Sequence, residues 1–187
     1  MIEQTIFVPD FHYPRYTAIV FPAYRYFPGI NPHPTENPLG HSFGKKEEVA
    51  EKIDPRRWQD NQRWLYAVDL YNFAYWWESH EVLEGFWRAV PKTSVESGFF
   101  QGLIKVSAAF LKWASKERRG VQIHFESAMD LLGKAQRQET VFMGIDLKNH
   151  REKWQQHFQA VLIEPSTWPA PTKNYPFIIL EGLKEYS

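Results

Sequence analysis

Residues Tyr75–Val90 read Tyr-Trp-Trp-Glu-Ser-His-Glu-Val-Leu-Glu-Gly-Phe-Trp-Arg-Ala-Val. On a helix with about 100° per residue, the large apolar side chains of this stretch fall on one broad face. His80, Glu84 and Arg88 are spaced four residues apart along the same face. Because that face should be packed, its polar groups must satisfy one another. The stretch therefore predicts a helix carrying a largely buried His/Glu/Arg cluster.

Glu78 falls on the opposite side of the same helix, where we expect solvent. A solvated carboxylate contributes little to stability, whereas removing one partner of a buried pair is costly. The pattern thus predicts that Glu84→Ala destabilises the fold more than Glu78→Ala.

Composition places the chain among globular proteins with a real core. It has 187 residues, of which 43% are hydrophobic and 24% charged, consistent with one domain plus appendages. Eight Trp, nine Tyr and fourteen Phe predict a core, or a contact surface, built from large rings.

The charge and cysteine counts exclude several functions. Lys plus Arg equals Asp plus Glu at 22 each, so no net field attracts nucleic acid or an anionic membrane. The absence of cysteine excludes disulfides, thiol catalysis and thiolate metal sites. The first residues lack the pattern of a signal peptide, and no apolar run reaches the roughly 20 residues of a membrane span. We therefore expect a soluble cytoplasmic protein.

The fold class indicated is all-α: a compact bundle of about five helices with an extended N-terminal arm and a short C-terminal tail. The expected divisions are an arm over 1–50 that packs on the body, a helical domain over 51–163 and a tail over 164–187. The arm combines frequent prolines, which oppose helix, with many large apolar side chains, which oppose disorder. In the tail, the run 177–180 is expected to be a strand or an extended segment docked on the bundle.

Apolar periodicity predicts helices over 55–72, 76–90, 94–115, 121–132 and 147–163. Residue types that begin or end helices mark the boundaries. They are Asp54 with Pro55, a left-handed break at Asn72, Pro91, Thr93 with Glu96, Gly120 and Asp146.

The order His80-Glu81-x-x-Glu84 is close to a zinc-hydrolase helix, in which two histidines four residues apart share one metal. Here Glu84 replaces the second histidine, so His33, His41, His124 or another carboxylate would have to complete the shell. We therefore predict no metal and no cofactor, and keep a hydrolase using His80 and Glu84 as an alternative.

The arm could contribute to the site. Its loop over 25–44 contains His33 and His41 and is braced by prolines. We expect residues 1–50 to be ordered, with this loop lying near the end of the helix that carries His80. The alternative is that the arm packs elsewhere and both histidines are solvated.

The helix over 94–115 adds further polar groups. Gln101, Lys105 and Lys112 share its less apolar side. One interpretation is a solvated face; the other is that Gln101 and Lys105 face Glu81 and Glu84 across a crevice between helices.

The combined pattern is similar to that of a known family. Asn72, His80-Glu81-x-x-Glu84-x-x-Trp87-Arg88 and Phe100-Gln101-Gly102-Leu103-Ile104 together resemble the domain-of-unknown-function family numbered 309, over roughly residues 56–132. The resemblance implies a compact helical fold and a cytoplasmic location, and it implies no reaction. Two positions depart from the family pattern: Lys105 replaces an uncharged polar residue, and Ser79 replaces a small apolar one.

Three function classes follow. The first is a protein whose polar site binds a small ligand or a protein partner; the second is the hydrolase; the third is an interaction protein whose polar network only fixes packing. For the first, the expected partners include neither nucleic acid nor a membrane, and a homodimer is left open. The expected ligand-binding residues are Asn72, His80, Glu81, Glu84, Arg88, Gln101 and Lys105.

Overall fold

The computed structural model describes residues 15–45, 52–163 and 175–183, and predictions that concern 1–14, 46–51, 164–174 and 184–187 lie outside it. Its described part is mostly helical, which confirms the all-α prediction. Five α-helices are joined by a short 3-10 helix and a two-stranded hairpin that the sequence did not predict. The elements are η1 (Pro55–Asp60), α1 (Gln62–Asn72), α2 (Trp76–Arg88), α3 (Val95–Ala114), α4 (Arg118–Gln136), β1 (Val141–Phe142), β2 (Ile145–Asp146) and α5 (Leu147–Ile163).

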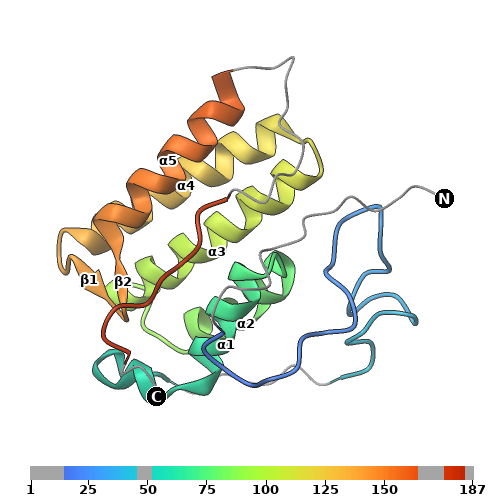
Figure 1. Ribbon diagram of the computed structural model, residues 1–187, viewed down its shortest axis with the longest axis horizontal. Coiled ribbons are helices and arrows are strands. Elements are labelled where there is room, and N and C mark those ends of the chain that lie inside the picture. Colours follow the sequence, from blue (N-terminus) through green and yellow to red (C-terminus); the bar gives the residue numbers. More distant parts are fainter. Residues whose placement is uncertain (1–14, 46–51, 164–174, 184–187) are drawn as a thin grey trace.

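The helix α3 is the centre of the bundle. It packs against α2 on one side and α4 on the other, while α1 packs on α2 and α5 on α4 (Figure 1). Because it has neighbours on several sides, α3 is buried around most of its circumference. One stripe remains half-exposed, and its members are Gln101, Lys105, Ala108 and Lys112.

The first predicted helix is divided in two. Asp54 accepts a hydrogen bond from the amide of Arg56 at the start of η1, as expected of a helix cap. The chain then extends at Asn61, whose side chain caps α1 through the amide of Trp64. A second capping residue inside the predicted helix explains why one helix became two.

The end of α1 confirms the predicted boundary and corrects its mechanism. The helix ends at Asn72, but the left-handed residue is Ala74, with φ 62°. The amide of Tyr75 donates to the carbonyl of Leu70 at 2.8 Å, which closes a Schellman motif.

The start of α3 differs from prediction, because Ser94, rather than Thr93, caps the helix.

The turn between α3 and α4 also differs from prediction. The reversal occurs at Lys116, with φ 59°, and Gly120 lies inside α4 instead of ending a helix. A Cβ atom at Gly120 would lie 2.8 Å from the Lys112 side chain, so the glycine serves close helix packing.

The hairpin turns at Met143 and Gly144, whose φ angles of 46° and 80° are typical of a two-residue type I′ turn. It leads directly into α5, where Asp146 accepts from the amide of Asn149, as predicted. In the described part of the chain, no helix is both long and apolar enough to cross a membrane.

The described part of the tail, residues 175–183, is extended and crosses the bundle (Figure 1, red). Its amide at Ile178 donates to the Asn72 side chain at 2.8 Å, and the same side chain donates back to the Ile178 carbonyl at 2.8 Å. The Glu181 amide also donates to the Gly144 carbonyl of the hairpin at 2.7 Å. The segment therefore docks in an extended conformation and forms no strand over residues 175–183.

Candidate functional site

The polar groups of α2 separate onto different sides of the helix. Arg88 donates to Glu84 with Nη2 and Oε2 at 2.8 Å, but the Arg88 side chain is 51% exposed. His80 has Glu81, rather than Glu84, as its ion-pair neighbour, with Nδ1 and Oε1 at 3.3 Å. The predicted single buried cluster is therefore wrong: Glu84 and Arg88 form a surface pair, and His80 stands apart from it.

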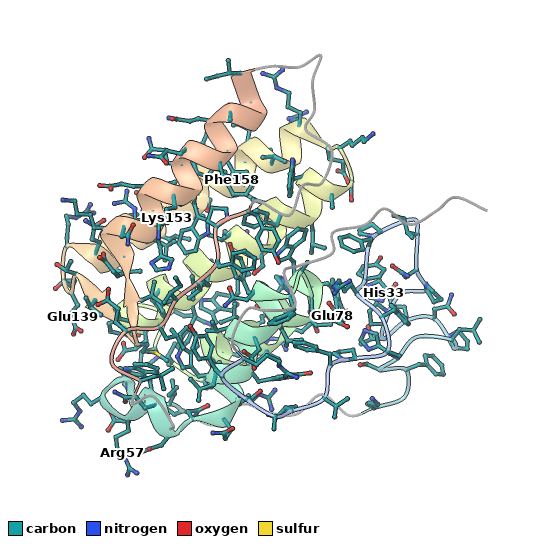
Figure 2. The ribbon with its side chains drawn as sticks, in the orientation of Figure 1. His33, Arg57, Glu78, Glu139, Lys153 and Phe158 are labelled. Atoms are coloured by element: carbon teal, nitrogen blue, oxygen red, sulfur yellow. The ribbon has the colours of Figure 1, made fainter. Side chains whose placement is uncertain are left out.

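The buried carboxylate of α2 is Glu78, which we expected in solvent. Its side chain is 5% exposed, and its Oε1 accepts from the Tyr26 amide and the His41 imidazole, both at 3.0 Å. The arm covers this side of the helix, as the positions of Glu78 and His33 show (Figure 2). The helical pattern identified the face packed on the bundle but could not show that the arm buries the opposite face.

The arm loop lies on the first turn of α2. The His33 ring packs edge-on against Trp77 at 5.5 Å between centroids, and the His41 ring lies 6.4 Å from the same indole. His33 Nδ1 accepts from the Glu36 amide. The loop thus lies near the predicted end of α2, but both rings pack on Trp77, one turn before His80.

Asp69 is a buried carboxylate that the sequence analysis did not single out. It is fully buried in α1 and accepts from the amides of Tyr16 and Thr17 at 2.8 and 2.9 Å. Burial raises the pKa of this carboxyl, against the opposing effects of those hydrogen bonds and of Arg15. An aspartate inside the apolar run 64–71 was the available signal.

Asn72 has a structural role as well. Its side-chain oxygen and nitrogen both bind Ile178, and its carbonyl accepts from the Tyr175 hydroxyl at 2.5 Å. Of the residues predicted to bind a ligand, Asn72 is therefore committed to the tail.

The remaining predicted residues lie on α2 and α3, which pack against each other. Ring contacts of Trp76 with Phe110 at 4.9 Å, and of Phe86 with Phe100 at 5.3 Å, show that the two helices run antiparallel. This register brings His80 level with Lys105, and Glu84 level with Gln101.

The helix α4 approaches α3 from the other side. Gly120 lies against the Lys112 side chain, and Gly98 faces the Leu131 carbonyl. Lys105 is midway between Gly98 and Lys112, so it is level with the part of α4 that begins at His124.

The electrostatics of His124 agree with this placement. Burial lowers the pKa of its imidazole, Lys105, Lys112 and His80 lower it further, and Glu117 acts in the opposite direction. Three helices therefore bring cationic groups together here. We call this group the polar seam; it consists of His80, Glu84, Gln101, Lys105, Lys112 and His124.

Several groups of the polar seam lack partners. The Nδ1 atoms of His80 and His124 are buried and have no hydrogen bond within the described structure. The 3.3 Å approach of Glu81 to His80 is close enough for charge interaction but not aligned for a hydrogen bond. Gln101 and Lys105 are half-buried and make no hydrogen bond or ion pair in residues 15–45, 52–163 and 175–183. The polar seam thus contains hydrogen-bonding groups that could bind a ligand.

His124 was missing from the predicted binding residues, although it was considered as a metal ligand. Among the residues that the structure describes, no three His, Asp or Glu side chains are arranged to hold a metal ion. A solvent-open hollow lies elsewhere, between η1, the hairpin and Glu181, and contains none of the predicted residues.

Comparison with known proteins gives one match. Residues 64–123 match the family model described as Domain of unknown function (DUF309), which confirms the resemblance over a shorter range than expected. The matched range includes five members of the polar seam, and His124 follows it by one residue. No curated protein and no solved structure matches the chain.

Proposed function

We propose that this protein is a helical ligand-binding module whose polar seam binds a small polar molecule. The observation that carries the proposal is the set of unpartnered, half-buried groups that three helices bring to one level. These groups are His80, Lys105 and His124.

Two polar groups with a structural role, Asp69 and Asn72, use all their hydrogen-bonding atoms. Asp69 accepts three hydrogen bonds from the arm, two from amides and one from the Thr17 hydroxyl at 2.8 Å. Asn72 uses both atoms of its amide on one residue of the tail. Buried polar groups are normally satisfied in this way, because an unmade hydrogen bond costs about 1–3 kcal/mol. Buried atoms without a hydrogen bond also occur elsewhere in the described residues, for example Glu78 Oε2 and His157 Nε2. The proposal therefore rests on the position of His80 and His124 beside Lys105, which pairs with no carboxylate in the described residues.

The protein is proposed to bind its ligand in the cytoplasm, because a chain without cysteine needs no oxidising compartment. Equal numbers of acidic and basic residues favour a small molecule, or a protein partner, over nucleic acid or a membrane. The proposal assigns binding to the polar seam and no reaction.

A screen of small metabolites by thermal shift, followed by calorimetry, tests the proposal. We expect at least one compound to stabilise the protein and to bind about tenfold more weakly to Lys105→Gln and His124→Gln. A lost charge-assisted hydrogen bond of about 1.5–3 kcal/mol corresponds to at least that factor.

Lys134→Gln is the matched control, because Lys134 is also on α4 but pairs with Asp130 at the exposed surface. Its affinity should equal that of the unaltered protein. A screen in which nothing binds, or in which all three variants bind equally well, would contradict the proposal.

A further inference from the structure

We infer that the polar seam is an oxyanion site, binding a phosphate or carboxylate group of its ligand between Lys105, His124 and His80. The inference rests on the proposed function and adds the chemical class of the ligand. It is drawn from the charges, the donors and the register of the three helices.

Two charged pairs of this region leave Lys105 outside them, while the Glu81 carboxylate lies 3.3 Å from the His80 imidazole. The ammonium of Lys112 pairs with Glu117 at 2.8 Å, and Glu84 pairs with Arg88 at 2.8 Å. Lys105 has no carboxylate partner within the described residues. The Lys105 ammonium is therefore available for a charge-assisted hydrogen bond to an anion from solution.

The hydrogen-bonding groups of the polar seam are mainly donors, and an anion accepts hydrogen bonds. Lys105 offers N–H donors and no acceptor, and the Gln101 amide adds two more donors. The imidazoles of His80 and His124 each have an unpartnered Nδ1 and become double donors when protonated. Phosphate and carboxylate oxygens accept several such bonds at once, whereas a cation would be repelled by Lys105.

The arrangement couples binding to protonation. The charged groups that act on His124 are His80 from α2, Lys105 and Lys112 from α3, and Glu117 from the turn before α4, and Glu81 lies beside His80 at 3.3 Å. Burial and the cations of this set lower the pKa of His124. An anion bound among these groups favours the imidazolium, so binding should take up a proton and strengthen as the pH falls from 8 to 6.

Titration of the full-length protein with inorganic phosphate, sulfate and acetate, followed by histidine-selective NMR and calorimetry, tests this inference. We expect at least one anion to shift the imidazole signals of His80 and His124 and to raise the pKa of His124. Lys105→Gln should weaken binding about tenfold, whereas Lys105→Arg, which keeps the charge, should retain it. A response to phosphate and sulfate would indicate a phosphate-bearing ligand, and a response to acetate a carboxylate.

The inference is overturned if no anion shifts these signals, or if Lys105→Gln binds as well as the unaltered protein. Failure of the broader proposal looks different. If a neutral or cationic compound from the screen binds in a way that depends on His124, the ligand-binding function stands and the anion class falls. If no compound of any charge binds, both fall.

Discussion

The carboxylate of Glu78 shows how one residue can join two distant parts of the chain. It is buried on α2 and accepts hydrogen bonds from Tyr26 and His41 of the arm. Glu78→Ala removes both bonds and leaves Nε2 of the His41 imidazole, whose side chain is 6% exposed, without its partner. We expect a loss of about 3 kcal/mol, because breaking a buried pair costs about 3–5 kcal/mol.

Glu84→Ala is the matched comparison, since it removes a carboxylate from the same helix. Its partner Arg88 is half-exposed, so the loss should stay within about 0.5 kcal/mol. Urea denaturation of both variants measures the difference. This order reverses the sequence-based expectation, and equal midpoints would show that the arm does not bury Glu78.

His157 should make stability depend on acid. Burial among Phe110, Trp113 and Phe158 lowers the pKa of its imidazole from 6.5 to about 4. Between these values the unfolded chain binds the proton and the folded chain does not, so stability is fully present above pH 6.5. It should fall toward pH 4 by up to about 1.4 kcal/mol per pH unit.

Denaturation at pH 7 and pH 5 tests this dependence. His157→Leu should reduce the difference between the two midpoints. Burial also lowers the pKa of His150, so some acid sensitivity should remain. Phe158→Leu, which alters the same packing without removing an ionisable group, should lower both midpoints equally. A His157→Leu variant with unchanged acid sensitivity would contradict the assignment.

The end of α3 offers a stabilising substitution. Lys116 is exposed and left-handed, with φ 59°, and its amide donates to the Trp113 carbonyl at 3.0 Å. A non-glycine residue in this conformation costs about 1–2 kcal/mol, and glycine removes that cost. Glycine also raises the conformational entropy of the unfolded chain, which offsets part of the gain. Lys116→Gly should therefore raise stability by about 1 kcal/mol.

Lys116→Ala controls for loss of the side chain, because alanine keeps the conformational cost. Thermal unfolding should place the glycine variant several degrees above the alanine variant. If the two melt together, the left-handed turn at Lys116 is not formed in solution.

The helices were predictable because each carries its own signal. The pattern of α5 gave both its ends, and the Asp146 cap was correct because the contact spans three residues. The break at Asn61 was missed since a second cap inside an apolar pattern reads as an ordinary polar residue. The turn at Lys116 was missed because glycine, the usual signal for such a turn, stands four residues later at Gly120.

The candidate site divides in the same way. The helical spacing of Gln101 and Lys105 on one side of α3 could be predicted from periodicity. That the two residues face Glu81 and Glu84 across a crevice stays a prediction. The place of His124 could not be predicted, because it depends on how α4 packs on α3. The burial of Glu78 depends on contacts 52 residues away in sequence, which no local pattern encodes.

Arm and tail are tied to the bundle at neighbouring places. Tyr16 of the arm donates its hydroxyl to the Ile178 carbonyl at 3.4 Å and accepts from the Leu180 amide at 3.0 Å. The arm binds α1 through Asp69, and the tail binds the same helix through Asn72. Segments from opposite ends of the chain thus stabilise one another around α1, and the contribution of the arm can be measured.

Phe27 and Val20 provide that measurement within the intact chain. Phe27 is 3% exposed, and its ring packs edge-on against Trp76 at 6.1 Å, inside the main core. Val20 is 84% exposed. Phe27→Ala should cost about 3–5 kcal/mol, as for a ring removed from a core, whereas Val20→Ala should stay within about 0.5 kcal/mol.

Truncation of residues 1–44 extends the test. It removes Phe27 together with the arm's bonds to Asp69 and Glu78, so it uncovers the cluster of Phe73 and Tyr75, against which Phe21 packs. We expect lower thermal stability and self-association, measured by light scattering. Removing a ring from the core must lower stability. If the truncated protein stays monomeric and equally stable, and Phe27→Ala is as stable as Val20→Ala, the arm contributes nothing to the core.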